Sequence, residues 1–264
     1  MKYVFIYKNN NPASVEMAER LAEMLSANDL TPVSEFSNST DFVISIGGDG
    51  SFLRALQACN YANIPVLGIK TGHLGFFCEL SCDDQDTVLD IIKSGKYAVQ
   101  KHRTIRTEVS TVKGDFVLEH ALNDVLVKKD NSSLTHFKLS IGDSFIENFS
   151  GDGLLIASSA GSTAYNYALG GSIVDPRLDL LQITPMAPAN NATYRNFTSS
   201  LLAPPDQKIL LEPIDAKKTV VITDGLENHY EDVTRISVSL SDNEIQIVRL
   251  PGYDFWGKVK SKFL

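Results

Sequence analysis

The stretch DFVISIGGDGSFLRAL, residues 41–56, decides how the first part of the chain folds. A six-residue run typical of a buried strand leads directly into a turn with three glycines, and a helical pattern follows from Ser51. A glycine-rich turn between a strand and a helix exposes backbone N–H groups that bind phosphate. Asp49 lies in this turn, where a carboxylate can take a proton from an attacking hydroxyl or hold a metal ion that phosphates share. The alternative is a plain tight turn with a capping acid.

Strands and helices alternate on both sides of this stretch, within the first 95 residues. Strand patterns occupy 3–7, 41–46 and 64–69, and apolar helical faces occupy 13–26, 51–58 and 86–94. Strands of unbroken apolar character between helices predict a parallel sheet that is covered on both faces. We therefore expect an N-terminal α/β nucleotide-binding domain.

The pattern changes after Lys96 to β-type segments joined by short turns, at 104–112, 116–127, 136–149 and 235–248. Gly142-Asp143 and Asp242-Asn243 are expected as hairpin tips. The segment 161–169 is helix-like, and 253–264 predicts a short amphipathic helix that packs back on the first domain. The expected fold is thus α/β plus β, with domains at 1–98 (joined by the tail 250–264) and 99–249, the second built from layered sheets.

Composition narrows the class of protein. Of the 264 residues, 43% are hydrophobic and 21% charged, as in soluble globular proteins, and no apolar run approaches the ~20 residues of a membrane helix. A net charge of −8 argues against nucleic-acid binding, so a phosphate ligand must be held by local backbone amides, helix N-termini or a metal ion. Three cysteines without framework spacing fit a reducing compartment, and we expect a cytoplasmic protein.

Three further stretches carry polar or small residues at places where a ligand could bind. TGHLGFF, 71–77, is a second glycine-bearing turn after a strand. In ALNDVLV, Asn123 and Asp124 suit the paired hydroxyls of a ribose, although a simple turn or bulge is the alternative. The segment 150–176 combines Asp152 between glycines with AGSTAY, whose small residues leave room for a flat base beside Tyr165.

Several common nucleotide-binding motifs are missing from the sequence. The chain has no G-x-x-x-x-G-K-[ST], no G-x-G-x-x-G and no H-R-D kinase loop. P-loop enzymes, standard Rossmann dehydrogenases and protein kinases therefore lose support.

The motifs GGDGS, TGHLGF, LND, GDGL…GSTAYNYALGG and TDG, in this order and spacing, resemble the NAD kinase family over essentially the whole chain. The resemblance implies phosphorylation of the 2′-hydroxyl of the adenosine ribose of NAD, with ATP and Mg²⁺ or another divalent cation. It also implies a homodimer or homotetramer whose NAD site is completed across subunits. No residues are assigned to the metal, which the phosphates are expected to hold. NAD and ATP are the expected partners, with no nucleic acid and no membrane.

The resemblance also implies roles for individual residues. Asp49 would be the base that orients the 2′-hydroxyl and accepts its proton late, with Gly48 and Gly50 beside the phosphates. The other implied substrate-binding residues are His73, Phe76 (against the adenine), Asn123 and Asp124 (on the ribose), Asp152, Thr163, Ala164 and Tyr165 (around the adenine), Ala187, Tyr194 (near the added phosphate) and Asp224 of TDG.

The chain departs from the family pattern at three places. Asp124 stands where glutamate is common, ASSAG (157–161) replaces a frequent S-T-P-T-G, and Ala168 replaces a frequent serine. Two alternatives remain open: another GGDG-type kinase that acts on a lipid or a small molecule such as a sugar, and a degenerate member that binds NAD without turning it over.

Overall fold

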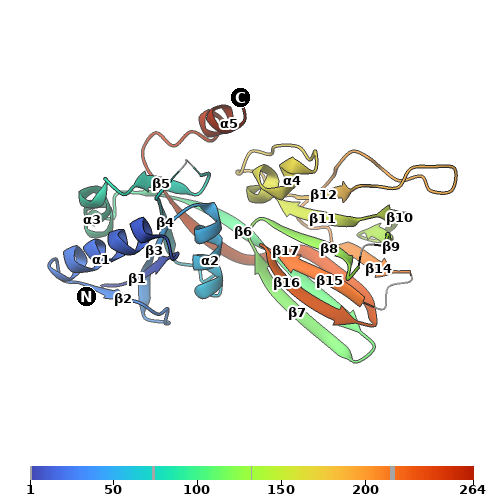
Figure 1. The fold of residues 1–264 in the computed structure, drawn as a ribbon, viewed down its shortest axis with the longest axis horizontal. Helices are drawn as coiled ribbons and strands as arrows, with labels where there is room; N and C mark the ends of the chain where they lie inside the picture. Colours follow the sequence, from blue (N-terminus) through green and yellow to red (C-terminus); the bar gives the residue numbers. More distant parts are fainter. Residues whose placement is uncertain (1, 73–74, 132, 215–217) are drawn as a thin grey trace. The chain divides into compact units, whose positions relative to one another are not determined.

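The computed structural model describes residues 2–72, 75–131, 133–214 and 218–264. Contacts divide the chain into two compact units, which are Met1–His102 with Glu244–Leu264, and Arg103–Asn243 (Figure 1). The division of the chain into domains 1–98 with 250–264, and 99–249, stays a prediction.

The first unit is built on a parallel sheet with the strand order β2-β1-β3-β4, and β5 and the end of β17 both pair with β4. Its strands are β1 (Lys2–Lys8), β2 (Leu30–Val33), β3 (Thr40–Ile46), β4 (Pro65–Lys70) and β5 (Cys78–Ser81). Its helices are α1 (Pro12–Ser26), α2 (Asp49–Ala58), α3 (Gln85–Ser94) and the C-terminal α5 (Phe255–Phe263).

Helices cover both faces of this sheet. The chain passes from β1 through α1 to β2 in one direction, and from β3 through α2 to β4 in the other. Because such crossovers are right-handed, α1 and α2 lie on opposite faces. Leu21 of α1 shares a buried cluster with Val88 of α3, whereas Phe52 of α2 stacks on Phe77 with ring centroids 5.0 Å apart.

The second unit consists of antiparallel sheets around one core. One is a six-stranded sheet with the order β13-β12-β11-β8-β15-β16, and the other contains β10-β9-β14-β17, with β6 paired to β17 and β7 paired to β6. The strands are β6 (Ala98–Thr111), β7 (Gly114–Ala121), β8 (Asp124–Lys129), β9 (Thr135–Ile141), β10 (Ser144–Gly151), β11 (Gly153–Ser158), β12 (Leu181–Met186), β13 (Leu201–Ala203), β14 (Ile209–Pro213), β15 (Lys218–Thr223), β16 (Leu226–Glu231) and β17 (Val233–Arg249). A 3-10 turn, η1 (Ala160–Thr163), and a one-turn helix, α4 (Tyr165–Ala168), interrupt them.

The core of the second unit lies between these layers. Fully buried side chains from β8 and β11, such as Val125 and Ile156, join Phe137 of β9 and Phe149 of β10 in one apolar cluster. Burial of such a cluster is the main stabilising contribution to a β-sandwich-like layer pair. The fold class expected from the sequence, α/β plus layered sheets with the C-terminal tail on the first unit, is confirmed.

One expected hairpin is wrong, and one is confirmed. β9 and β10 do form a hairpin across Gly142-Asp143, with Ser144 opposite Ile141. At Asp242-Asn243, however, β17 continues without a turn to Arg249. Side chains of β6 hold this part of β17 extended: Arg103 donates to the carbonyl of Ser241 at 2.9 Å, and Thr104 Oγ1 donates to that of Asn243 at 3.2 Å.

No described helix is both long enough and apolar enough to span a membrane.

Candidate active site

The glycine turn lies at the point of the first sheet where the chain connections change direction. β1 and β3 are neighbours, and their crossovers run to opposite sides, so their carboxyl ends form the switch point at which open α/β sheets bind ligands. Asn9, directly after β1, donates from Nδ2 to Oγ of Ser51 at 3.0 Å. The N–H of Gly47 bonds the carbonyl of Ile69 in β4 at 2.8 Å. The turn is thus fixed to the ends of three neighbouring strands.

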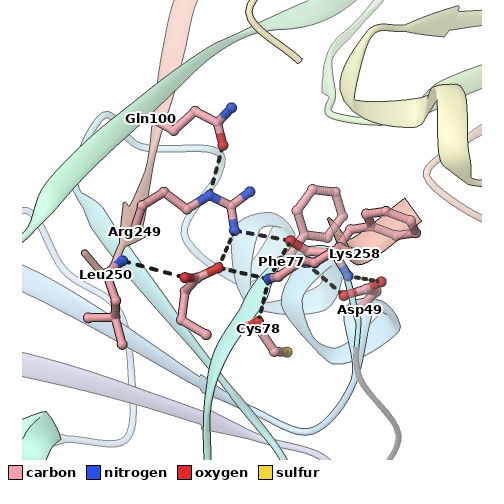
Figure 2. Close-up of polar contacts among 9 residues, drawn as sticks. Asp49, Phe77, Cys78, Gln100, Arg249, Leu250 and Lys258 are labelled. Atoms are coloured by element: carbon pink, nitrogen blue, oxygen red, sulfur yellow. Dashed lines mark hydrogen bonds and ion pairs between the residues drawn. The ribbon is translucent and has the colours of Figure 1, made fainter. Parts of the chain in front are cut away.

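Asp49 is the first residue of α2, two residues earlier than the helix start expected from the sequence. Its carboxylate accepts the N–H of Phe76 on Oδ2 at 2.9 Å. On Oδ1 it accepts the N–H of Phe77 at 3.0 Å, and Figure 2 labels these two residues. Nζ of Lys262 lies 3.6 Å from Oδ2, and a quarter of the Asp49 side chain remains exposed. The carboxylate therefore joins the GGDG turn to the TGHLGFF stretch while one side stays accessible to solvent.

The glycines of these two stretches differ in what surrounds them. A Cβ at Gly75 would lie 2.1 Å from Oδ1 of Asp49, so a side chain there would displace the carboxylate. Gly47 has a φ of +143° and would place a Cβ 2.1 Å from Oγ of Ser51. Among the described residues, no atom lies within 4 Å of a Cβ added at Gly48 or Gly50, so their packing leaves the space over this part of the turn open.

Phe76 is covered by the C-terminal helix. Its ring centroid lies 6.0 Å from that of Phe255 and 5.8 Å from that of Phe263, and its exposure is 5%. Nζ of Lys262 lies 4.8 Å from the centre of the same ring. The contact of Phe76 with adenine stays a prediction, while His73 lies outside the described residues.

Buried charges fasten α5 to the first unit. Oε1 of Glu79 accepts from Arg249 at 2.7 Å and from Lys258 at 2.8 Å, and the Glu79 and Arg249 side chains are each 5% exposed. Arg249 also donates from Nε to Oε1 of Gln100 at 2.7 Å. Figure 2 marks this contact with a dashed line. Burial lowers the pKa of Lys258, and the neighbouring Glu79 acts in the opposite direction.

In the second unit, Asp224 holds the start of β8. Its carboxylate accepts the N–H groups of Leu122 at 2.6 Å, Asn123 at 2.8 Å and Asp124 at 3.3 Å, and its own φ is +46°. Burial, and then the charge of Asp224, raise the pKa of Asp124 to about 7. The LND and TDG motifs therefore form one cluster, although they lie about a hundred residues apart in the chain.

Asn123 lies in the connection between β7 and β8, so the strand expected over 116–127 is divided at this point. The residue is 7% exposed, and within the described residues Oδ1 has no hydrogen-bond partner. A Cβ at Gly161 would lie 2.0 Å from the Asn123 carbonyl oxygen, which ties η1 to this connection. The buried amide oxygen is therefore able to take a donor from a ligand.

The GSTAY segment presents some residues to solvent and uses others to hold its shape. Thr163 and Ala164 are half-buried and Tyr165 is exposed, whereas Ser162 and Asn166 are fully buried. The amide of Asn166 binds the carbonyls of two residues and accepts from Thr184 Oγ1, and Ser162 bonds both backbone groups of Val174. These polar contacts place 163–165 at the accessible side of the loop.

Asp152 and Ala187 lie at adjacent strand ends. The N–H of Asp152, between β10 and β11, bonds the carbonyl of Met186 at the end of β12 at 2.9 Å. A Cβ at Gly151 would lie 2.9 Å from the same oxygen, so the glycine allows this close approach. Asp152 is exposed, and Ala187 follows Met186 with a φ of +42°.

Tyr194 lines a cavity of about 500 Å³ in the second unit. Its ring centroid lies 5.6 Å from that of His136, whose Nδ1 hydrogen-bonds Ser150 Oγ at 2.8 Å. Arg195 lines the same cavity. His136 and Arg195 lie outside the motifs that were identified in the sequence.

Comparison with curated proteins gives full-length relatives. An NAD kinase of Finegoldia magna is 34% identical over 269 residues, covering 100% of this chain and 98% of the relative. An NAD kinase of Pediococcus pentosaceus is 31% identical, covering 99% and 97%. The family models for the ATP-NAD kinase N-terminal and C-terminal domains match residues 31–97 and 122–250.

The chain belongs to the NAD kinase family. The family identified from the motifs is therefore confirmed, as is the expectation of a kinase, a transferase that acts on NAD and binds ATP.

Solved structures share the NAD kinase fold. Yeast NADH kinase in complex with NADH superposes with a TM-score of 0.83 at 24% identity, covering all of this chain and 87% of the other. An NAD kinase from Archaeoglobus fulgidus in complex with ATP gives a TM-score of 0.77 at 22% identity, covering 99% of both.

The structure brings the implied NAD kinase residues together in groups. The group in the first unit consists of Gly48, Asp49, Gly50 and Phe76. The second unit contains three groups: Asn123, Asp124 and Asp224 with the 163–165 segment; Asp152 with Ala187; and Tyr194. Their convergence on one dinucleotide stays a prediction. Lys262 and its anchor Lys258 were not identified from the sequence, although their four-residue spacing on an expected helix places them on one face.

Proposed function

We propose that this chain transfers the γ-phosphoryl group of ATP to the 2′-hydroxyl of the adenosine ribose of NAD, which yields NADP and ADP. Family membership supports the class of reaction, and one feature of the first unit supports where the phosphates and the attacking hydroxyl would bind. Among the described residues the space over Gly48 and Gly50 at the N-terminus of α2 is open, and the carboxylate of Asp49, which stands between them in the chain, is partly accessible. Backbone N–H groups there can bind phosphate oxygens, and Asp49 can face the hydroxyl that attacks.

The chemical task of Asp49 is to orient the hydroxyl and take up its proton. The new bond joins the ribose 2′-oxygen to the γ-phosphorus, and the bond from that phosphorus to the bridging oxygen of ADP breaks. In a loose transition state the hydroxyl keeps its proton until late, so Asp49 accepts it as the bond forms. The two N–H donors from Phe76 and Phe77 fix the carboxylate plane for this role.

A divalent cation is part of the proposal, and the phosphates would supply most of its ligands. Among the described residues, no three His, Cys, Asp or Glu side chains gather as a cation site. The accessible side of the Asp49 carboxylate would be able to supply one oxygen ligand to an ion whose other ligands are phosphate and water oxygens. When bound, Mg²⁺ neutralises charge that develops on the transferred phosphoryl group.

The second unit would hold the rest of the dinucleotide. We assign the ribose hydroxyls to Asn123 and Asp124, because within the described part of the chain the buried amide oxygen of Asn123 has no hydrogen-bond partner, and Asp124 offers a carboxyl group at the next position. The adenine would contact the accessible 163–165 segment. Asp152 and Ala187 would contact the other end of NAD, and Tyr194 would contact the added phosphate. Asp224 would act by holding the backbone of 122–124.

We further propose a homodimer or homotetramer in the cytoplasm, where NAD and ATP are available. Phe145 and Ile146 of β10 are 54% and 40% exposed, and Ile214 of the same unit is 56% exposed. Exposed apolar side chains of this kind are typical of subunit contacts. Light scattering of the purified protein would give the subunit number.

One assay tests the proposed reaction. Purified protein is incubated with NAD, ATP and Mg²⁺, and NADP is detected with an NADP-specific dehydrogenase; inorganic polyphosphate replaces ATP in a parallel reaction. The proposal predicts NADP that accumulates with time and requires a phosphoryl donor. A protein that binds NAD yet forms no NADP would support the degenerate binding protein, and phosphorylation of a lipid or sugar alone would support the other GGDG-type kinase.

A further inference from the structure

Lys262 places a positive charge directly beside the Asp49 carboxylate. Its Nζ lies 3.6 Å from Oδ2, and 39% of its side chain is exposed. The side chain also lies over the face of Phe76, with Nζ 4.8 Å from the ring centre. Because the ammonium group is partly hydrated, it can turn from Asp49 to another anion without being pulled out of the protein interior.

The position of Lys262 is determined by the fold. Lys258, one turn earlier on α5, donates to the carbonyl of Cys78 at 2.9 Å and to Glu79 at 2.8 Å. Residues four apart lie on the same helix face, so this anchor directs Lys262 to the glycine turn. The contact of Phe263 with Phe76 fixes the last turn of α5 as well.

Lys262 supplies a cation that the glycine turn itself does not offer. From 46 to 56 the chain contains one basic residue, Arg54, and its guanidinium bonds Gln57 at 2.8 Å. The carboxylate of Asp49 repels phosphate oxygens that approach the same turn. A lysine at this distance offsets that repulsion, and its compact ammonium group is well suited to phosphate.

We propose that Lys262 binds the phosphates of the donor nucleotide: it pairs with Asp49 in the empty site and turns to phosphate oxygens of ATP when the nucleotide binds. The inference rests on the proposed function, because it takes ATP as the donor. Transfer of the ammonium group from Asp49 to phosphate would leave Oδ2 of Asp49 available for the ribose hydroxyl. The C-terminal helix is then part of the donor site as well as of the packing.

The test is binding of Mg·ATP, measured by isothermal titration calorimetry on the full chain. Lys262→Met keeps the aliphatic stem over Phe76 and removes the charge, Lys262→Arg keeps the charge, and Lys260→Met is the matched control on the exposed side of the same helix. Loss of one charged hydrogen bond predicts at least ~10-fold weaker ATP binding for Lys262→Met, whereas Lys262→Arg stays within ~3-fold of wild type. Lys260→Met should bind as wild type does. Lys262→Gln, tested in parallel, gives the same answer if the methionine variant does not fold.

Three results would overturn the inference. The first is that Lys262→Met and Lys262→Gln bind Mg·ATP within twofold of wild type. The second is that they bind it more tightly, which would mean that Lys262 competes with the nucleotide for the site. Lys260→Met could also weaken binding as much as Lys262→Met, which would mean that only the overall charge of α5 matters. Failure of the proposed function is a separate outcome, since a wild-type protein that forms no NADP can still bind ATP through Lys262.

Discussion

Replacing Asp124 with asparagine should change how stability depends on pH. Burial beside Asp224 raises the pKa of Asp124 from 3.8 to about 7 in the folded chain. Below about pH 4 the carboxyl is protonated in both states. As the pH rises further, the unfolded chain releases this proton first, so the free energy of unfolding falls by about 1.4 kcal/mol per pH unit until the folded carboxyl ionises near pH 7. From pH 5 to pH 8, the titration of Asp124 alone therefore lowers the free energy of unfolding by roughly 2 to 3 kcal/mol.

The asparagine variant lacks this titration. The free energy of unfolding of Asp124→Asn, minus that of wild type, should therefore increase by roughly 2 to 3 kcal/mol from pH 5 to pH 8. Urea unfolding followed by circular dichroism at both pH values gives this difference. Asp206→Asn, at an exposed carboxylate of the same unit, is the matched control for the loss of one carboxylate. A flat difference for Asp124→Asn would refute the raised pKa.

Two further substitutions test the contacts that hold the site. Glu79→Gln should lower the free energy of unfolding by about 3 kcal/mol, as measured by urea unfolding. The buried charges of Arg249 and Lys258 would then have a neutral amide in place of the carboxylate that they now share. Gly161→Ala should weaken NAD binding at least ~10-fold and cost roughly 1 to 3 kcal/mol of stability, because its Cβ would displace the Asn123 carbonyl 2.0 Å away; calorimetry with NAD and urea unfolding measure both effects.

Matched controls exist for both. Glu212→Gln removes an exposed partner of Lys138 and should change stability by less than about 1 kcal/mol. Gly72→Ala adds a Cβ that meets no atom of the described residues within 4 Å, so it should not show the loss of stability that overpacking gives. Equal effects of Glu79→Gln and Glu212→Gln would contradict the role of the buried charges, and equal effects of the two glycine variants would contradict the role of the close approach at Gly161.

Local patterns in the sequence were sufficient for much of the fold. The buried strand before Gly47 and the apolar face of α1 both follow from side-chain periodicity, which depends only on neighbours in the chain. The turn at Asp242 was expected for the same kind of reason and is absent, because Arg103 of β6, over a hundred residues away, stabilises an extended strand there. A tertiary contact of this kind leaves no signal in the local pattern.

In the candidate site too, local motifs identified some residues, whereas contacts between distant parts of the chain left no local signal. Asp49 and Asn123 were identifiable from glycine-rich and polar motifs. The pairing of Asp49 with Lys262, and of Asp224 with the N–H groups of 122–124, joins residues distant in sequence. The raised pKa of Asp124 depends on burial and on that pairing, so the sequence contained no direct indication of it. Asn166 is fully buried and holds the 163–165 segment, a role that its place within GSTAYNYALGG did not indicate.

Turnover of Asp49→Asn tests the central claim most directly, since the variant keeps the shape of the side chain and removes its ability to accept a proton as a carboxylate. NADP formation with NAD, ATP and Mg²⁺ should fall by about 10² to 10⁴ in kcat, while the dissociation constant for NAD stays within about threefold of wild type. A variant that forms NADP at nearly the wild-type rate would show that Asp49 does not act on the ribose hydroxyl.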